Sequence, residues 1–255
     1  MQRVEAAIPS SRGRLAATIH YPEKESGRLA ILCPGYLDSK DYWHLVGLAD
    51  ALCSQGYVAV RFDPTGTWGS EGSIAEYTTT QYLEDIRGVL EYMLQRGDYP
   101  HVLLGGHSRG GMVSILLAAR DPRISLVLGI MPSSGRSMTE RGREEWKATG
   151  VRVSHRDVSN TRNERREFLV PYTHMEDRDR YNVAMDVRDV KVPIVLIAGE
   201  HDELVRPEDV RKIFDNANEP KSLTVVAGIG HDYRRRADDV TKVNEMVLEQ
   251  LQKLS

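Results

Sequence analysis

Short apolar runs alternate with amphipathic stretches along most of the chain. The runs lack a polar face, which is typical of parallel strands that helices cover on both sides of a sheet. Six of them are predicted to be strands: residues 29–33, 58–62, 102–106, 125–131, 192–198 and 222–226. This alternation predicts an α/β protein built on a mostly parallel sheet.

The segments around these strands carry hairpin and helix signals. Residues 3–8 and 15–21 flank a short polar turn, so they are expected to pair as an antiparallel hairpin. A helix over residues 42–54 is predicted to have Asp41 as its N-cap and to stop at Gly56. The other predicted helices span residues 80–95, 108–120, 207–216 and 237–254.

Residues 133–182 break this rhythm. No strand pattern is visible there, and 20 of the 50 residues are charged. Long loops without secondary structure are uncommon in compact domains, so the segment is expected to be a helical insertion. The alternative is a solvated, charged excursion without a role. The chain is therefore divided into a core, residues 1–132 and 183–255, and the insertion, residues 133–182.

Composition and charge narrow the range of partners. With 255 residues, 40% hydrophobic and 28% charged, the chain has the profile of a globular protein with a substantial core. Its net charge of −3 provides no basic field for nucleic acid. No stretch approaches the roughly 18 uncharged apolar residues of a membrane span, and no signal peptide is visible. We expect a cytoplasmic protein that binds neither nucleic acid nor membrane, and a homo-oligomer is left open.

Cysteine and histidine spacing gives no reason to expect a metal or a cofactor. Cys33 and Cys53 fall in a predicted strand and a predicted helix, so both are expected to be buried free thiols. Neither C-x-x-C nor H-E-x-x-H occurs. The neighbouring pairs His201-Asp202 and His231-Asp232 are weak metal candidates, because adjacent residues rarely ligate one ion together.

The candidate nucleophile is Ser108, in the run Gly106-His107-Ser108-Arg109-Gly110. Chance could supply so short a pattern, but here an apolar strand leads into it and a buried helix leads out. The tight turn is expected to strain the serine backbone and to require glycines on either side. The helix N-terminus then points amides toward developing negative charge. The plain alternative is a glycine-rich turn without chemistry.

A serine hydroxyl needs a base and a third group that orients the base. His231 lies on a glycine-flanked loop just past a strand and is the expected base. Asp202 follows another strand at the edge where α/β active sites lie, and is the expected acid. Glu200 and His201 are the nearest alternatives. His107 adjoins the nucleophile and is ambiguous, and the remaining histidines are expected to be structural or on the surface: His20, His44, His101, His155 and His174.

Two backbone amides are placed to bind an oxyanion. Tyr36 lies in the loop after the strand at residues 29–33, and Arg109 directly follows the nucleophile. Their N–H groups are the expected donors.

Together these elements resemble the α/β-hydrolase superfamily, and within it small bacterial esterases of the cinnamoyl and feruloyl esterase type and lipase-like enzymes. The resemblance covers nearly the whole chain. It rests on five motifs in order: P-G-Y at 34–36, R-F-D-P-T-G-T-W-G-S-E-G at 61–72, G-H-S-R-G-G at 106–111, G-E-H-D at 199–202 and G-H-D-Y at 230–233.

The resemblance implies an α/β-hydrolase fold, with an eight-stranded sheet, helices on both faces and a cap formed by residues 133–182 over the pocket. It also implies that Ser108, Asp202 and His231 form a catalytic triad. The amides of Tyr36 and Arg109 would then form the oxyanion hole. Two positions depart from the pattern. Pro34 stands where many relatives have histidine, and Trp68 stands where a second glycine is frequent. Trp68 is expected either near the pocket or in packing.

The expected activity is hydrolysis of a small-molecule carboxylic ester through an acyl-enzyme, without a cofactor. Thioesterases, amidases, peptidases and acyltransferases use the same triad, and a non-catalytic protein that binds a ligand in the pocket is an alternative of another class. The eleven basic residues of the insertion favour a polar or acidic substrate over a long acyl chain. Its aromatic residues lie scattered among them: Trp146, Phe168, Tyr172 and Tyr181.

Overall fold

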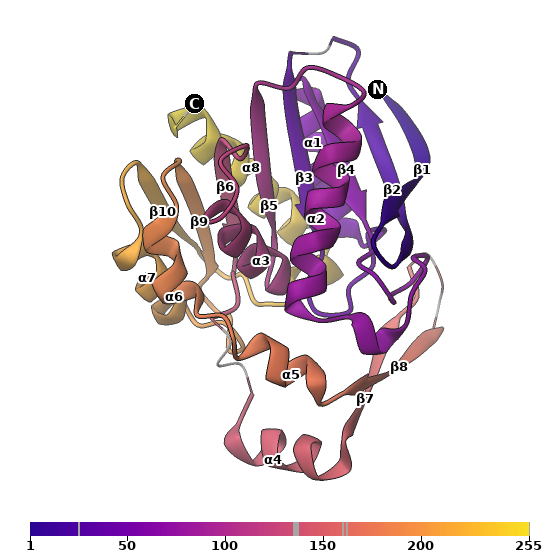
Figure 1. Ribbon diagram of the computed structural model, residues 1–255. Helices are drawn as coiled ribbons and strands as arrows, with labels where there is room; N and C mark the ends of the chain where they lie inside the picture. The colour runs from indigo at the N-terminus through magenta and orange to yellow at the C-terminus, as the bar shows by residue number, and fades with distance from the viewer. Residues whose placement is uncertain (25, 135–137, 160, 162, 255) are drawn as a thin grey trace.

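An eight-stranded sheet runs through the centre of the molecule (Figure 1). The computed structural model describes residues 1–24, 26–134, 138–159, 161 and 163–254. The strand order is β1-β2-β4-β3-β5-β6-β9-β10; β2 pairs antiparallel with β1 and β4, and the other neighbours are parallel. The strands are β1 (Gln2–Ser10), β2 (Gly13–Tyr21), β3 (Arg28–Cys33), β4 (Tyr57–Phe62), β5 (His101–His107), β6 (Leu126–Ile130), β9 (Ile194–Gly199) and β10 (Lys221–Val226).

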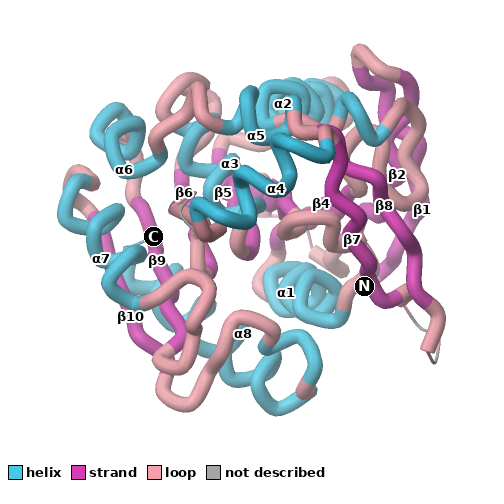
Figure 2. The backbone as a smooth tube through the Cα atoms, turned by 90° about the horizontal axis from the view of Figure 1, so that it is seen from below, coloured by secondary structure: helices cyan, strands magenta, loops and turns pink. Residues whose placement is uncertain are grey.

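Helices cover both faces of this sheet, as the sequence predicts. Helices α1 and α8 lie on one face, and α2 and α3 lie on the other (Figure 2). The core helices are α1 (Trp43–Ser54), α2 (Thr79–Leu94), α3 (Arg109–Ala118), α6 (Val183–Asp186), α7 (Pro207–Asn216) and α8 (Ala237–Leu254), with short 3₁₀ turns at Ile74–Glu76, Val187–Asp189 and Tyr233–Arg235. Every residue of β4, β6 and β9 is buried, because these strands are covered on both faces.

The insertion contains strands as well as helices, so the expectation of a helical segment is corrected here. It comprises α4 (Glu140–Thr149), β7 (Val151–Asp157), β8 (Arg165–Pro171) and α5 (Thr173–Arg178), and β7 pairs antiparallel with β8. Most residues of this hairpin are exposed or half-buried. Its strands therefore carry many charged side chains, and these hide the alternation by which a strand is recognised.

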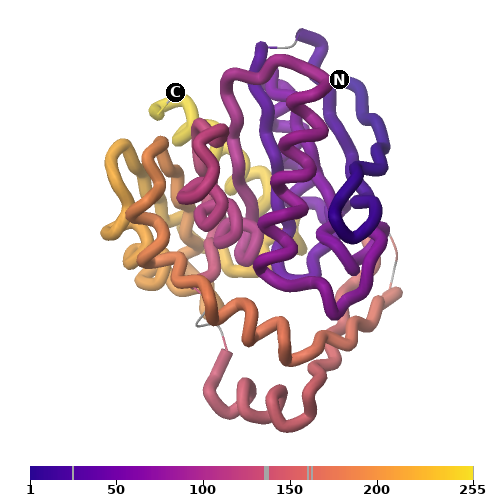
Figure 3. Tube along the Cα trace, viewed as in Figure 1, coloured from indigo at the N-terminus to yellow at the C-terminus, as the bar shows by residue number. Residues whose placement is uncertain are grey.

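Hydrogen bonds attach the insertion to one end of the sheet, where Figures 1 and 3 show it. Asp177 on α5 accepts the N–H of Thr80 (2.9 Å) and its hydroxyl (2.5 Å) at the start of α2. On β7, the carbonyl of Asp157 accepts the hydroxyl of Tyr42 (2.7 Å). The insertion is thus tied to two separate parts of the core.

Of the remaining local predictions, that of the first helix cap is wrong and that of the cysteines is confirmed. Helix α1 begins one residue later than expected, with Tyr42 as its N-cap, so the prediction of Asp41 is wrong. The Asp41 carboxylate instead contacts Lys40 Nζ (3.0 Å) and Arg61 Nη1 (2.9 Å). Both cysteines are buried and free, as predicted. Among the described helices, none has the length and apolarity that crossing a membrane requires.

Candidate active site

Ser108 lies at the sharp turn between β5 and α3. Its backbone has φ 53° and ψ −115°, a conformation that residues other than glycine rarely adopt. Its N–H donates to Ile130 O (2.9 Å) on β6, and its carbonyl accepts the N–H groups of Met112 (3.1 Å) and Ser133 (3.0 Å). These three bonds hold the strained turn in place.

The two glycines of the motif allow the end of β3 to approach this turn. A Cβ at Gly106 would lie 2.1 Å from Cys33 O, and one at Gly110 would lie 1.9 Å from the same atom and 2.8 Å from Pro34 O. No side chain fits at such distances. The expected crowding is therefore present, and its source is the neighbouring strand. The turn that carries Ser108 and the loop that carries Tyr36 consequently pack directly together.

His231 lies between Ser108 and Asp202. Its Nε2 is 3.0 Å from Ser108 Oγ, and its Nδ1 is 2.7 Å from Asp202 Oδ2. Because a carboxylate only accepts, Nδ1 is the donor of that bond and Nε2 is free to accept the serine proton. The other oxygen of Asp202 accepts the N–H groups of Leu204 (2.9 Å) and Val205 (2.7 Å). Asp202 is 2% exposed, and both oxygens of its carboxylate are therefore fixed by hydrogen bonds.

The two alternatives from the sequence lie outside this chain of hydrogen bonds. Glu200 accepts the N–H of Gly228 (2.8 Å) and faces His201 Nε2 at 3.6 Å. Both side chains are more than half exposed. The structure thus brings together Ser108, His231 and Asp202 in the expected order.

Tyr36 and Arg109 both line the same cavity as Ser108. The loop that carries Tyr36 is held by Tyr82, whose hydroxyl donates to Pro34 O (2.9 Å), and by Tyr77, whose hydroxyl accepts the N–H of Leu37 (2.9 Å). Arg109 is the first residue of α3. Its N–H therefore belongs to the first turn, in which amides have no carbonyl partner within the helix.

The cavity has a volume of about 740 Å³ and lies between the ends of the strands and the insertion. Arginines dominate its charged lining, which favours a ligand with negative charge. The charged residues of the lining are Arg109, Arg152, Arg156, Arg165, Arg178, Arg234 and Arg235, and Asp38, Asp157, Glu203 and Asp232.

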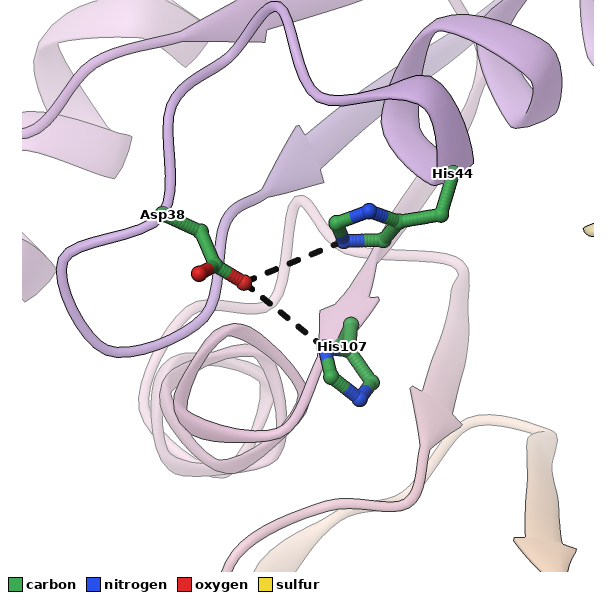
Figure 4. Close-up of side chains that lie close together, drawn as sticks. All are labelled: Asp38, His44 and His107. Atoms are coloured by element: carbon green, nitrogen blue, oxygen red, sulfur yellow. Dashed lines mark ion pairs between the residues drawn. The ribbon is translucent and has the colours of Figure 1, made fainter. Parts of the chain in front are cut away.

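Asp38, His44 and His107 form a buried cluster of side chains (Figure 4). Asp38 Oδ2 is 4.0 Å from His44 Nε2 and 3.9 Å from His107 Nδ1. The ring of His107 also packs against His231, with centroids 4.7 Å apart. None of the four ring nitrogens of His44 and His107 has a hydrogen-bond partner among the described residues. His107 therefore shapes the surroundings of the base and takes no part in the chain of hydrogen bonds itself.

The charge state of this cluster follows from its burial. Burial alone raises the pKa of Asp38, but the interactions with His107, His44 and Arg156 outweigh it and lower the pKa to about 2. Burial lowers the pKa of His44 to about 3 and also lowers that of His107. At neutral pH the cluster therefore holds one carboxylate and two neutral imidazoles.

One carboxylate and two imidazoles are a donor set that suits a divalent metal. In the described part of the chain, no other group of three histidine, cysteine, aspartate or glutamate side chains has its ligand atoms this close together. The donor atoms all lie within 4.8 Å of one another, and the two distances from Asp38 Oδ2 are 4.0 and 3.9 Å. Metal–ligand bonds of about 2 Å would require them to move closer together.

A model of the alpha/beta hydrolase family matches residues 30–243. The chain belongs to the α/β-hydrolase family. The matched range contains the Ser108 turn, the Asp202 loop and the His231 loop, so the residues that the structure brings together all lie within the family's own region.

Relatives within the family are distant in sequence. The mouse protein "Palmitoyl-protein thioesterase ABHD10, mitochondrial" is 22% identical over 215 residues, which is 82% of this chain and 70% of that one. A structure of Est1E from Butyrivibrio proteoclasticus with ferulic acid superposes with a TM-score of 0.78, at 20% identity and 98% coverage of both chains. A structure of DcsB with a substrate analogue gives a TM-score of 0.82, at 16% identity and full coverage of both chains. At these identities the structural likeness establishes the fold alone.

The two departures from the family pattern have separate roles here. The carbonyl of Pro34 accepts the Tyr82 hydroxyl and thus helps to hold the loop before Tyr36. Trp68 donates from Nε1 to Leu37 O (3.0 Å), and its ring packs edge-on against Phe168 of the insertion. Trp68 therefore has the packing role that the sequence left open.

The surroundings of the Arg109 side chain could not be predicted from the sequence. His174, expected to be structural or on the surface, is buried on α5 and lines the cavity, with a nitrogen 2.8 Å from Arg109 Nη1. It also contacts the carbonyl of Tyr77 (2.7 Å). Nothing in the sequence near His174 signals this pairing, because the two residues are 65 positions apart.

Proposed function

We propose that the protein is a serine hydrolase that cleaves a carboxylic ester through an acyl-enzyme. The observation that carries this proposal is the position of His231, within hydrogen-bond distance of Ser108 Oγ on one side and of Asp202 on the other. Such an arrangement turns an ordinary hydroxyl into a nucleophile, because the proton has an acceptor as the new bond forms.

In the first half of the reaction, Ser108 Oγ attacks the carbonyl carbon of the ester while its proton passes to His231 Nε2. The carbonyl oxygen becomes an oxyanion, for which the N–H groups of Tyr36 and Arg109 are the proposed donors. His231 then gives the proton to the leaving alcohol as the carbon–oxygen bond breaks. Asp202 orients the imidazole and stabilises its positive charge.

In the second half, water attacks the acyl-enzyme. His231 takes a proton from the water and returns it to Ser108 Oγ when the acyl group leaves as a carboxylic acid. The first and last of these proton transfers join Ser108 Oγ and His231 Nε2, which lie 3.0 Å apart. No cofactor is required in this scheme.

The insertion is the proposed cap of the site. Its residues form much of the cavity lining, including Trp146, Ser154 and His174. A substrate held between the cap and Ser108 would be partly shielded from water, which strengthens electrostatic interactions there.

Thioester hydrolysis is the second candidate. It is favoured by the mouse relative, whose name states palmitoyl-protein thioesterase activity. The same nucleophile, base and oxyanion donors serve this reaction, with a thiolate as the leaving group.

The test is substitution of the nucleophile. Ser108→Ala is expected to lower kcat for a short-chain 4-nitrophenyl ester by roughly a million-fold, because triad members act as a unit. A fluorophosphonate probe should label the wild type at Ser108 and leave the variant unlabelled. Circular dichroism and thermal unfolding serve as controls for the fold. A variant that keeps wild-type turnover would exclude Ser108 as nucleophile, and parallel ester and thioester assays would separate the two candidate activities.

A further inference from the structure

The side chain of Arg109 is a buried cation beside the nucleophile. Arg109 is 4% exposed and lines the cavity. Its guanidinium carbon lies 4.2 Å from the ring centre of Tyr77 and 5.8 Å from that of Tyr82. One terminal nitrogen, Nη1, contacts His174. The guanidinium is therefore held in a fixed orientation by two aromatic rings and an imidazole.

This cation has no acidic partner among the described residues. Its Nη1 contacts the imidazole of His174, its Nε and Nη2 are buried without a hydrogen-bond partner, and no carboxylate of that set lies within ion-pair distance. His174 does not supply a compensating charge, because burial and the nearby Arg109 lower its pKa well below the usual value and keep it neutral. A buried charge without a partner is costly, so a fold that retains one invites a ligand of opposite charge.

A second cation lies on the same side of the cavity. Arg178 on α5 lines it, and its Nη2 donates to Ser134 O (3.0 Å). Burial and the charges of Arg109 and Arg143 lower the pKa of Arg178, which reflects a region of positive potential. In the described part of the chain, no carboxylate pairs with Arg178.

Two other arginines of the cavity lining are different. Arg234 and Arg235 both face Asp157, at 3.6 and 3.4 Å, and both face Asp232, at 3.7 and 3.1 Å. Their charges are already compensated within the protein. Arg152 also lines the cavity and makes no ion pair with a described carboxylate. The uncompensated positive charge of the lining therefore lies on Arg109, Arg178 and Arg152.

We propose that Arg109 and Arg178 form a subsite for an anionic group, a carboxylate or a phosphate, of the substrate that Ser108 attacks. This inference rests on the proposed function for the identity of the attacked bond. The unpartnered Nε and Nη2 of Arg109 are the two adjacent N–H groups on one edge of the guanidinium. That edge has the geometry of a bidentate pair with two oxygens of a carboxylate or phosphate. Both nitrogens are covered in this structure, so the pairing requires the side chains over them to move. A neutral ester lacks the charge that would compensate both arginines.

The test measures binding without turnover, in the Ser108→Ala protein. Isothermal titration compares 4-nitrophenyl butyrate with three anionic esters: 4-nitrophenyl hemisuccinate, 4-carboxyphenyl butyrate and 4-phosphonooxyphenyl butyrate. These place a carboxylate in the acyl part, a carboxylate in the alcohol part, and a phosphate in the alcohol part. At least one is expected to bind tenfold or more tightly than the neutral ester, and the three arms identify which anion and which side the subsite accepts.

Variants assign the preference to the proposed residues. Adding Arg109→Met should reduce the ratio of anionic to neutral affinity at least tenfold, Arg178→Met should reduce it by a smaller factor, and Arg109→Lys should restore part of it. The matched control is Arg235→Met, because the charge of Arg235 is already compensated by Asp157 and Asp232. This variant should change the ratio of anionic to neutral affinity less than twofold. Thermal unfolding establishes that each variant is folded.

The outcomes separate the two proposals. Equal affinity for neutral and anionic esters, or a preference that survives Arg109→Met in a folded protein, overturns the anion subsite. Failure of the Ser108 hydrolysis test overturns the proposed reaction alone, because the titrations need no catalysis.

Discussion

A single methyl group at Gly110 would separate the Ser108 turn from the end of β3. The Cβ of alanine would lie 1.9 Å from Cys33 O. Because Cys33 O is a backbone atom and the Cβ position is fixed by the backbone of residue 110, neither atom has much freedom to move. We expect Gly110→Ala to lower the free energy of unfolding by at least about 3 kcal/mol, the upper range for overpacking. It should also reduce ester turnover, since the loop that carries Tyr36, the proposed oxyanion donor, would be displaced. Chemical denaturation and steady-state kinetics measure the two effects.

The matched control is Gly142→Ala in helix α4. There the nearest atom to the new Cβ would be Thr139 Oγ1 at 3.3 Å, and alanine is the better helix former. Its stability should stay within about 1 kcal/mol of the wild type. Similar losses at both positions would show that the close approach of β3 is not what requires glycine at 110.

At the residue level, the sequence was informative wherever a functional group follows a strand directly. Ser108, Asp202 and His231 each stand just past an apolar run, and parallel strands bring their carboxyl ends to one edge. The partners of the Arg109 side chain were not predictable in this way. They come from α5 and from the segment around Tyr77, and only tertiary packing brings these together.

At the level of elements, the side chain of Asp177 on α5 accepts two hydrogen bonds from Thr80 at the start of α2. Asp177→Ala removes both hydrogen bonds from Thr80. Each such bond to a charged group contributes about 1.5–3 kcal/mol. We expect faster hydrogen exchange at the amides of residues 173–178, with exchange in β5 unchanged. Mass spectrometry of peptides from the two segments measures this difference.

The control is Asp179→Ala in the same region. Asp179 pairs with Arg143, but both side chains are more than one third exposed. Exposed ion pairs contribute little, so exchange in α5 should change much less than in Asp177→Ala. Equal acceleration in both variants would contradict the anchoring role of Asp177.

Elements of the core were predicted closely because their hydrophobic periods are clear. Helices α7 and α8 begin and end where the sequence indicates, at 207–216 and 237–254. The hairpin β7–β8 was missed because few of its side chains are buried, so hydrophobic burial left little trace in its residues. Its stability depends on pairing and on the core beneath it.

At the scale of the whole molecule, buried neutral histidines make stability depend on pH. The pKa of His44 is about 3 in the folded protein, against about 6.5 when unfolded. Below pH 6.5 the unfolded state therefore binds the proton more readily, and stability falls as the pH falls. Between pH 7 and pH 5 this group alone should remove about 2 kcal/mol. Denaturant unfolding at both pH values measures the loss.

The variant His44→Phe should show a smaller loss by that amount, because phenylalanine binds no proton. The surface variant His155→Phe removes an ion pair with Glu167 in which both side chains are about half exposed. Such pairs contribute little, so its pH response should stay close to that of the wild type. The neighbours Asp38 and His107 are unchanged in both. An identical pH response in wild type and His44→Phe would refute this origin of acid sensitivity.

The family and the sheet follow from residues spread over the whole chain, and so they were predictable. A cytoplasmic location and the absence of nucleic-acid and membrane partners stay predictions. They depend on which other molecules the protein meets. Neither the hydrophobic pattern nor the sheet topology contains that information.

The guanidinium of Arg156 on β7 donates from Nε (3.1 Å) and Nη2 (2.9 Å) to the carbonyl of Tyr36. The amide of Tyr36 is the proposed oxyanion donor, so the insertion is hydrogen-bonded to the loop that would hold the oxyanion. Exchanging residues 133–182 for a foreign segment would be a natural route to new specificities. Any such graft would have to supply an equivalent cation that donates to the carbonyl of Tyr36. Without it, a change in substrate selectivity would be accompanied by a lower turnover rate.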